Sequence, residues 1–306
     1  MEVVLAKPRG FCAGVKRAIA TVRQALEMHG APVYVLHEIV HNTHVIDDLE
    51  AKGAIFVEEL EEIPAGSITI FSAHGVARSV EERAQALGLR TIDATCPLVS
   101  RVHRRVSRLN RIGYDVLVIG HKGHPEVVGT CGHARGAVHV VSTPEEVAAL
   151  EVADPARVGY VTQTTLSLED TRHMLAAIRE RFPDISEPER TDICYATTNR
   201  QLAVRELAGM VDLVFIVGSR NSSNSNRLRE VAEQGGVPAR LIDDATDIRD
   251  EWLAGVERIG ISAGASAPEY LVSQVITRLE EDHTVTLREM QGDDETITFQ
   301  VPQLAV

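Results

Sequence analysis

Three cysteines occupy the same kind of position along the chain, and their thiols are the side chains best suited to bind a metal. Cys12, Cys96 and Cys194 each lie where an apolar, strand-like segment gives way to a helical pattern. The free N–H groups and the dipole of a helix N-terminus favour the thiolate, which is the form that binds metals. A single such cysteine is usually a small buried hydrophobe. Three in equivalent settings predict one metal centre built by three similar units.

The number and spacing of these thiols indicate the kind of centre. Thiolates select zinc or iron–sulfur clusters, and structural zinc is normally bound by local pairs such as C-x2-C, which the sequence lacks. A 4Fe–4S cluster ordinarily has four cysteine ligands. We therefore predict one 4Fe–4S cluster with three cysteine ligands and one open iron, which implies redox or dehydration chemistry on an oxygen function. The fourth thiol, Cys131, has no counterpart and is predicted to be structural.

The segments around the three cysteines repeat a pattern of strands and helices. After each cysteine helix a strand is expected, at 33–36, 115–119 and 213–217. Two further strands are expected in each repeat, at 54–57 and 68–71, at 137–141 and 158–161, and at 239–242 and 259–262. Such alternation is typical of open, mostly parallel sheets. We predict an α/β fold of three similar lobes with mostly parallel sheets, in a pseudo-threefold arrangement around a central iron–sulfur cavity.

The repeats also suggest where the parts of the chain begin and end. We expect an N-terminal strand and first cysteine turn at 1–13, three lobes at 14–96, 97–190 and 191–281, and a tail at 282–306. The tail has two alternating segments around a Gly-Asp pair and lies outside the repeat. This pattern predicts a C-terminal β-hairpin that packs against the rest of the chain.

Polar side chains recur where the predicted strands end, which is where open α/β sheets bind ligands. His41, His124 and Asn224 follow their cysteines by about 29, 28 and 30 residues, counted along the repeat. The corresponding residues near the fourth strand are His74, Thr164 and Ser266, at about 62, 68 and 72 residues. A lone histidine or serine usually only caps a helix. Recurrence in three lobes favours a site whose donors bind a phosphate or diphosphate.

Two further features add to this anion site. Ser222 and Ser223 precede Asn224 at a predicted helix N-terminus, where they could be simple caps or phosphate ligands. Glu126, two residues after His124, is the one carboxylate within the recurring set. Buried beside an anion, it would have a raised pKa and could donate a proton. The alternative is that Glu126 only stabilises the start of its own helix.

Composition limits the possible partners and the compartment. The net charge of −13 argues against nucleic acid or an anionic membrane as a partner. No apolar run approaches the roughly 20 residues of a membrane span, and no signal peptide is recognisable. Four widely spaced cysteines in a large acidic chain are typical of a reducing compartment. We therefore expect a cytoplasmic location.

Several long motifs carry a resemblance to a known family. They read RGFCAGVKRAI, FSAHGV, DATCPLV, GHPEVVGT, TQTTLS, DICYATTNRQ, GSRNSSNSNRL and SAGASAP. Together they resemble the LytB family, whose members reduce 4-hydroxy-3-methylbut-2-enyl diphosphate in the non-mevalonate pathway of isoprenoid biosynthesis. The resemblance covers residues 1–281, and the tail is also similar.

The resemblance implies roles for the recurring residues. Three similar α/β domains would surround one 4Fe–4S cluster held by Cys12, Cys96 and Cys194. Glu126 would deliver protons, and Thr164 would lie beside the substrate hydroxyl. The implied contacts to the substrate, chiefly to its diphosphate, come from His41, His74, His124, Thr164, Ser222, Ser223, Asn224 and Ser266.

The implied reaction is a two-electron reductive dehydroxylation of an allylic diphosphate. Its products would be isopentenyl and dimethylallyl diphosphate, at the last step of the pathway. The resemblance implies that electrons come from a ferredoxin or flavodoxin-type donor. The sequence has no G-x-G-x-x-G motif, which argues against direct binding of a nicotinamide cofactor. Two alternatives stay open, namely a redox-silent hydro-lyase that uses the open iron, and a cluster-bearing electron carrier or iron sensor without a substrate.

Overall fold

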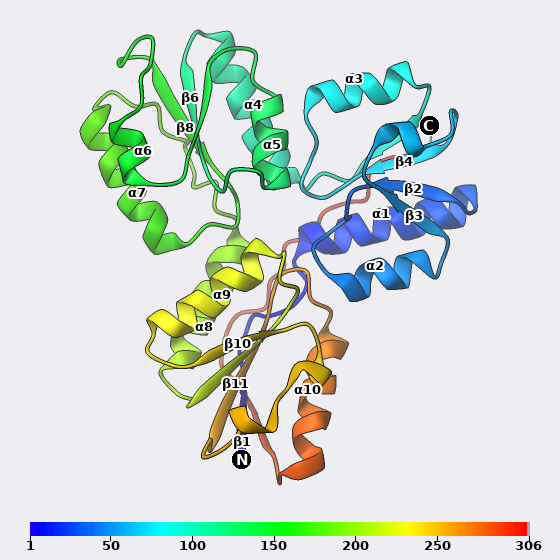
Figure 1. Ribbon diagram of the computed structural model, residues 1–306, viewed down its shortest axis with the longest axis vertical. Helices are drawn as coiled ribbons and strands as arrows, with labels where there is room; N and C mark the ends of the chain where they lie inside the picture. The colour runs from blue at the N-terminus through cyan, green and yellow to red at the C-terminus, as the bar shows by residue number, and fades with distance from the viewer. Residues whose placement is uncertain (305–306) are drawn as a thin grey trace. The chain divides into compact units, whose positions relative to one another are not determined.

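All three sheets of the protein are parallel, as the computed structural model shows for residues 1–304, the part of the chain that it describes (Figure 1). The strands of each sheet are separated in sequence by helices, so the chain crosses over between neighbouring strands. This arrangement confirms the predicted α/β class with three parallel-sheet lobes. No helix within residues 1–304 is both long enough and apolar enough to span a bilayer.

The largest sheet has five strands, which include the first and the last strand of the repeating segments. Its strand order is β10 (Ala239–Ile242), β9 (Leu213–Val217), β11 (Arg258–Ala263), β1 (Glu2–Leu5) and β12 (Thr286–Glu289). Its helices are α8 (Tyr195–Ala208), α9 (Ser223–Gln234) and α10 (Glu269–Asp282). Leu213, Phe215 and Val217 of β9 pack with α10, whereas Val214 and Ile216 pack with α8 and α9. Because both faces are covered, β9 is apolar throughout.

The four-stranded sheet is formed by the segment between the first two cysteines. Its order is β3 (Ala54–Val57), β2 (Val33–Leu36), β4 (Ile68–Phe71) and β5 (Arg90–Asp93). The helical elements of this segment are α1 (Ala13–His29), α2 (Thr43–Glu50), α3 (Arg78–Ala86) and the 3₁₀ turn Leu60–Glu62. Leu36 and Phe71 of the sheet pack against Ala84 of α3 in one apolar cluster.

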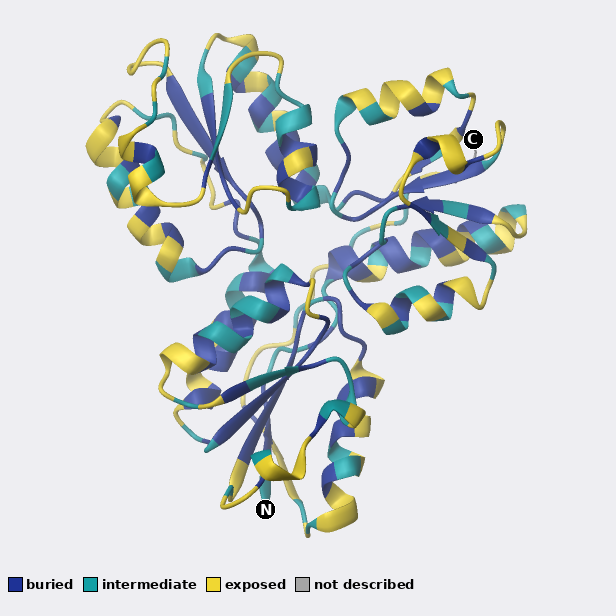
Figure 2. Cartoon of the chain, viewed as in Figure 1, coloured by how far each residue is buried: buried dark blue, intermediate teal, exposed yellow. Residues whose placement is uncertain are grey.

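The three-stranded sheet lies between the second and third cysteines. Its order is β7 (Val138–Val141), β6 (Asp115–Ile119) and β8 (Val158–Thr162). Its helices are α4 (Pro97–Arg111), α5 (Pro125–Gly132), α6 (Pro144–Ala148) and α7 (Leu168–Arg181). Helices α4 and α5 cover one face, and α6 and α7 cover the other. Figure 2 shows that one strand of each sheet is buried throughout, while the outward faces of the helices are exposed. These strands are β4, β8 and β9.

The chain divides into two compact units, each of which is described by itself. One unit comprises residues 1–15, 41–47 and 195–298 and holds the five-stranded sheet. The other comprises residues 16–40 and 48–194, together with the C-terminal residues from Phe299, and holds the other two sheets. The predicted lobe boundaries and the predicted threefold arrangement stay predictions.

The predicted β-hairpin in the tail is wrong. Thr286–Glu289 forms the single strand β12, which pairs in parallel with β1, and residues 290–304 contain no strand. The connection from β11 through α10 to β12 is a helical crossover within one sheet, which delivers a parallel strand. The first alternating segment of the tail therefore pairs with the free edge of β1. Gly292 packs against the Lys7 carbonyl instead of forming a turn.

The strand expected immediately before Cys194 is also absent. Residues 187–194 have no regular structure, and the nearest strand-like contact is a parallel bridge between Ser186 and Gly159 of β8. The buried carboxylate of Asp192 accepts a hydrogen bond from the Thr162 N–H at 3.2 Å and so takes one place that a strand backbone would fill. The hydrogen bond from Thr162 to Asp192 thus holds this segment beside β8 without the backbone hydrogen bonds of a paired strand.

Candidate functional site

The three predicted cluster ligands make the same backbone hydrogen bond. Each cysteine donates its N–H to a carbonyl two residues beyond the end of a strand. Cys12 donates to Ala265 after β11 (3.1 Å), Cys96 to Ala73 after β4 (3.0 Å), and Cys194 to Thr164 after β8 (3.1 Å). This shared contact fixes each thiol at the carboxyl end of a sheet, which is where α/β folds bind ligands.

Each of these cysteines also stands at the start of a helix. Cys96 is the N-cap of α4 and is followed by Pro97, while Cys12 and Cys194 directly precede α1 and α8. The Cys12 sulfur accepts the Val15 N–H at 3.4 Å. Burial raises the pKa of the Cys12 thiol, and this backbone hydrogen bond opposes the shift. None of the three cysteines forms a disulfide, and each is partly exposed.

The donor set therefore fits an iron–sulfur cluster in its chemistry. The three cysteines form no disulfide and lie at helix N-termini, and cysteine thiolates are the usual ligands of such clusters. Cys12 belongs to one unit, and Cys96 and Cys194 belong to the other. Within residues 1–304, no three His, Cys, Asp or Glu side chains form a group that could hold a single metal ion. The convergence of the three thiols stays a prediction.

Glu126 is a buried carboxyl group held by one neighbour. Only 2% of the residue is exposed, and its two oxygens accept hydrogen bonds from the Thr164 N–H (2.6 Å) and the Thr164 hydroxyl (2.9 Å). Burial raises the pKa of Glu126 to about 7, the two bonds from Thr164 oppose the shift, and the charge of Asp192 adds to it. A carboxyl group with this pKa can hold and release a proton near neutral pH.

The alternative role of Glu126 as a helix cap is not what the structure shows. His124 is the N-cap of α5, and its Nδ1 accepts the Glu126 N–H at 3.1 Å. The Glu126 side chain points instead to Thr164, whose carbonyl accepts the N–H of Cys194. Thr164 thus joins the acid directly to the turn of a predicted cluster ligand.

Two predicted histidines lie close to this acid. The rings of His74 and His124 are 6.0 Å apart between centroids and meet edge to face, with an interplanar angle of 89°. Ser72, at the end of β4, lies 3.4 Å from Nδ1 of His74 through its hydroxyl. The second unit therefore brings together four of the predicted site residues, from the loop after β4, the start of α5 and the end of β8.

The other predicted anion ligands come together in the first unit. Ser222 is the N-cap of α9, with its hydroxyl accepting the Ser225 N–H at 3.2 Å. Asn224 accepts the N–H of Ala265 at 2.8 Å, and the Ser266 hydroxyl donates to the His41 carbonyl at 2.8 Å. Ser223 is the half-buried first residue of α9. Ser222 therefore serves as the cap, which leaves Asn224 available for another role.

The amide of Asn224 has a donor without a partner. Its Nδ2 is buried and forms no hydrogen bond within residues 1–304. The Nδ2 of Asn42, directly after His41, is in the same condition, although its Oδ1 caps α2 through the Val45 N–H. A buried donor left unpaired costs about 1–3 kcal/mol. The two amide donors, from Asn224 and Asn42, lie beside predicted anion ligands. They fit a binding site in which an oxygen of the bound ligand would accept their hydrogen bonds.

Sequence reasoning missed several residues around the thiols. Asp192 raises the pKa of Glu126, Asn42 adds a second buried amide donor, and the Tyr195 hydroxyl accepts the Ala13 N–H at 3.1 Å beside the Cys12 turn. Arg200 is fully buried and is bonded to Glu295 of the tail. Asp192 and Tyr195 adjoin Cys194 in DICY, so adjacency to a recurring cysteine was the available signal for them. No recurring spacing pointed to Arg200 or Glu295.

Comparisons with known proteins agree with the motifs. A family profile described as LytB protein matches residues 3–280. A Bordetella pertussis protein named 4-hydroxy-3-methylbut-2-enyl diphosphate reductase is 58% identical over 302 residues, which cover 99% of this chain and 93% of the relative. An Azotobacter vinelandii protein of the same name is 55% identical and covers 99% of this chain and 98% of the relative.

Solved structures agree as well. The structure of E-1-hydroxy-2-methyl-but-2-enyl-4-diphosphate reductase from Plasmodium falciparum matches with a TM-score of 0.94 and 37% identity, covering 99% of this chain and 95% of that one. A second structure, of (E)-4-hydroxy-3-methyl-but-2-enyl diphosphate reductase, matches with a TM-score of 0.65 and 36% identity, covering 92% and 99%. These matches span nearly the whole chain and confirm the predicted family of reductases. The chain therefore belongs to the LytB protein family.

Proposed function

We propose that the protein reduces 4-hydroxy-3-methylbut-2-enyl diphosphate by removing its hydroxyl group. The balanced change is R–OH plus two electrons and two protons to R–H plus water, with isopentenyl and dimethylallyl diphosphate as products. The relatives named as reductases of this substrate support the proposal. The observation that carries it is the buried pair Glu126–Thr164, which places a proton donor next to the turn of Cys194.

One 4Fe–4S cluster with an open iron is part of this proposal, held by Cys12, Cys96 and Cys194. When bound, such a cluster supplies electrons and a Lewis-acidic iron. The chain contributes three thiols in equivalent turns, with N–H groups that favour their thiolate forms. Cys131 lies within α5 rather than at such a turn, and burial raises the pKa of its thiol, so it has no place in this ligand set.

The protein would deliver protons through Glu126. With a pKa of about 7, the carboxyl group is partly protonated at neutral pH, whereas an exposed glutamate is almost wholly ionised. Thr164 donates hydrogen bonds to both carboxyl oxygens of Glu126, which fixes the orientation of the carboxyl group and so the direction in which its proton can leave. The Thr164 hydroxyl is the link that can pass a hydrogen bond from this acid to the hydroxyl of the substrate.

The diphosphate would be held by the side chains of the predicted anion site. The set comprises the side chains of His41, His74, His124, Ser222, Ser223, Asn224 and Ser266. The unpartnered Nδ2 of Asn224 supports this assignment, because a phosphate oxygen would satisfy it. Hydrogen bonds to a charged oxygen are stronger than neutral ones, at about 1.5–3 kcal/mol each. The anion is therefore bound by local donors although the chain as a whole carries a charge of −13.

The two alternatives make different demands on this site. A redox-silent hydro-lyase would consume the substrate without a reductant. An electron carrier would need neither the hydrogen-bond donors of the diphosphate site nor Glu126. Incubation of the anaerobic protein with substrate, with and without reduced methyl viologen, separates the three functions. Substrate loss without reductant would establish the hydro-lyase, and absence of any substrate binding would establish the carrier.

The decisive variant is Glu126→Gln, and the chain supplies a matched control. Glu145 also follows a proline at the start of a helix, but it is exposed. We expect Glu126→Gln to bind substrate and to lose kcat by a factor of about 10²–10⁴, the usual share of a positioned acid. Glu145→Gln should keep the parent rate. Near-normal turnover of Glu126→Gln would remove this residue from the mechanism and leave His124 as the next donor to test.

A further inference from the structure

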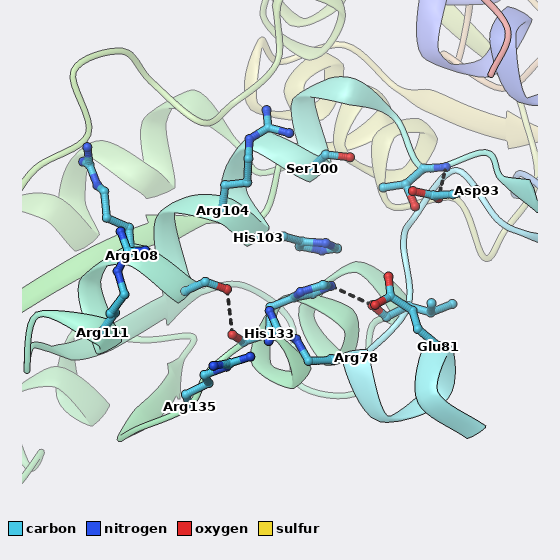
Figure 3. A pocket seen from close by; sticks show the side chains of 13 residues that line it. Arg78, Glu81, Asp93, Ser100, His103, Arg104, Arg108, Arg111, His133 and Arg135 are labelled. Carbon is cyan, nitrogen blue, oxygen red and sulfur yellow. Dashed lines mark hydrogen bonds between the residues drawn. The ribbon is translucent and has the colours of Figure 1, made fainter. Parts of the chain in front are cut away.

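A pocket of about 600 Å³ in the second unit is lined by five arginines. Arg78 comes from α3, Arg104, Arg108 and Arg111 come from α4, and Arg135 follows α5 (Figure 3). We call these five residues the basic pocket. Figure 3 shows their side chains around the stacked rings of His103 and His133, whose centroids are 4.2 Å apart.

The charge of the basic pocket is only partly balanced by neighbouring acids, because five arginines and two acidic residues line it. None of its five guanidinium groups forms an ion pair with any residue from 1 to 304. Guanidinium groups stay charged at all physiological pH values. Only Glu81 and Asp93 among the lining residues are acidic. In a chain with a net charge of −13, this pocket is a local reversal of sign that attracts anions.

The positive surface extends along α4 beyond this pocket. An adjoining hollow of about 260 Å³ shares Arg104 and Arg108 with it and adds Arg101 and Arg105. Glu189 and Asp192 also line this hollow, and Asp192 lies 3.7 Å from the Arg101 guanidinium, so Arg101 is partly neutralised. Arg101 and Arg105 donate to backbone carbonyls of the 160–191 segment and are thereby fixed in place. The arginines of α4 that form this face run from Arg101 to Arg111, which is about 15 Å along the helix axis. This face is longer than a single small anion.

The basic pocket also adjoins a predicted cluster ligand. Thr95 and Ser100, which flank Cys96 in sequence, line the pocket, and the Ser100 N–H donates to the Cys96 carbonyl at 2.9 Å. Arg104 follows Cys96 by eight residues on the same helix, which is about 12 Å along its axis. A redox partner bound here would therefore lie close to one ligand of the electron acceptor.

We propose that the basic pocket and the α4 face dock an acidic electron-transfer protein, a small ferredoxin or flavodoxin-type carrier that presents carboxylates to the arginines. The proposal rests on the proposed function, since it needs a cluster at Cys96. A one-electron carrier is oxidised once at each docking, so two dockings supply the two electrons that accompany two protons and the loss of water. Arginine binds carboxylates in a two-pronged fashion, which gives orientation as well as attraction.

The test uses charge reversal with a matched control. Arg104→Glu and Arg108→Glu change the docking face, while Arg172→Glu makes the same change at an exposed position on α7. Turnover is measured with a reduced plant-type ferredoxin and, separately, with two small reductants of opposite charge, methyl viologen and dithionite. Binding of the oxidised ferredoxin is measured by calorimetry at several salt concentrations.

We expect each α4 variant to raise the ferredoxin KM and Kd by about tenfold and to weaken their salt dependence, because rim charges act on association. Turnover with either small reductant should stay within about twofold of the parent. Equal ferredoxin effects in Arg172→Glu, or an unchanged ferredoxin Kd in both α4 variants, would overturn the proposal. A change confined to pyrophosphate binding would also overturn it and assign the pocket to a small anion.

The outcome separates this proposal from the proposed function. If the parent protein fails to reduce the substrate with methyl viologen, the proposed function is refuted. The calorimetric Kd values still decide whether the α4 face docks the carrier. If the parent is active with both small reductants and the α4 variants lose only ferredoxin-driven turnover, both proposals are supported.

Discussion

The strongest structural prediction concerns Arg200, whose guanidinium is completely buried in the first unit. Its five N–H groups all donate. Two reach the Gly10 carbonyl (3.0 and 2.7 Å), one reaches the Ala196 carbonyl (3.0 Å), and two reach the carboxylate of Glu295 (2.9 and 3.0 Å). Gly10, two residues before Cys12, has a φ of 68°, which favours glycine. Arg200 therefore ties α8 and the tail to the first cysteine turn.

Removing the counter-charge should be costly. Glu295 has a side chain that is only 13% exposed, so Glu295→Ala leaves a buried guanidinium without its anion. We expect the free energy of unfolding of the cluster-free protein to fall by about 3–5 kcal/mol. The double variant Arg200→Met with Glu295→Leu removes both charges and should lose less than the single variant does. As a control, Arg258→Ala breaks an exposed ion pair with Asp212 and should cost less than about 1 kcal/mol.

The same variants test whether this ion pair holds the cysteine turn. Anaerobic denaturant unfolding gives the stability, and timed alkylation of the apoprotein, followed peptide by peptide, gives the exposure of each thiol. Glu295→Ala should make Cys12 react faster, whereas Cys131, in the other unit, should react at the parent rate. A loss of stability below about 1 kcal/mol, or unchanged alkylation of Cys12, would refute the argument that Arg200 and Glu295 position this turn.

Three further predictions concern the cluster, the anion and the proton. Cys96→Ser should lose most of its bound iron and Cys131→Ser should keep it, as iron and sulfide analysis of anaerobically purified protein will show. Asn224→Ala should weaken binding of the diphosphate substrate by about 1–3 kcal/mol in calorimetry, and a purely thermal defect would reassign it to the fold. Turnover should fall as pH rises through 7, because Glu126 loses its proton there, and Glu126→Gln should lack this step. Between the ordinary glutamate pKa and pH 7, Glu126 is protonated more often in the folded protein than in the unfolded chain. The free energy of unfolding should therefore fall as pH rises through this window. Glu126→Gln should abolish that fall.

The sequence was sufficient to predict several strands of the repeat that surrounds the cysteines. The strands at 33–36, 54–57 and 213–217 have the predicted bounds, because short apolar runs between polar turns leave little freedom in a parallel sheet. The pairing of Glu126 with Thr164 could not be predicted, since 38 residues separate them and only the fold brings them into contact. Arg200 and Glu295 were missed for the same reason, because a buried ion pair across 95 residues has no local pattern.

The two errors in the fold share one physical cause, which is that a strand pairs with whichever sheet edge is free. The strand before Cys96 joins the sheet of the preceding segment as β5, beside β4, and β1 before Cys12 likewise pairs with β11. The segment before Cys194 follows this rule through the single bridge from Ser186 to β8. A strand at a sheet edge with one side unpaired can still accept a partner, and β1 accepts β12 from the tail. The repeating unit in space is therefore offset by one strand from the repeat in sequence. The segment before each cysteine thus lies beside β11, β4 or β8, and this pairing sets the cysteine N–H against the loop that follows that strand.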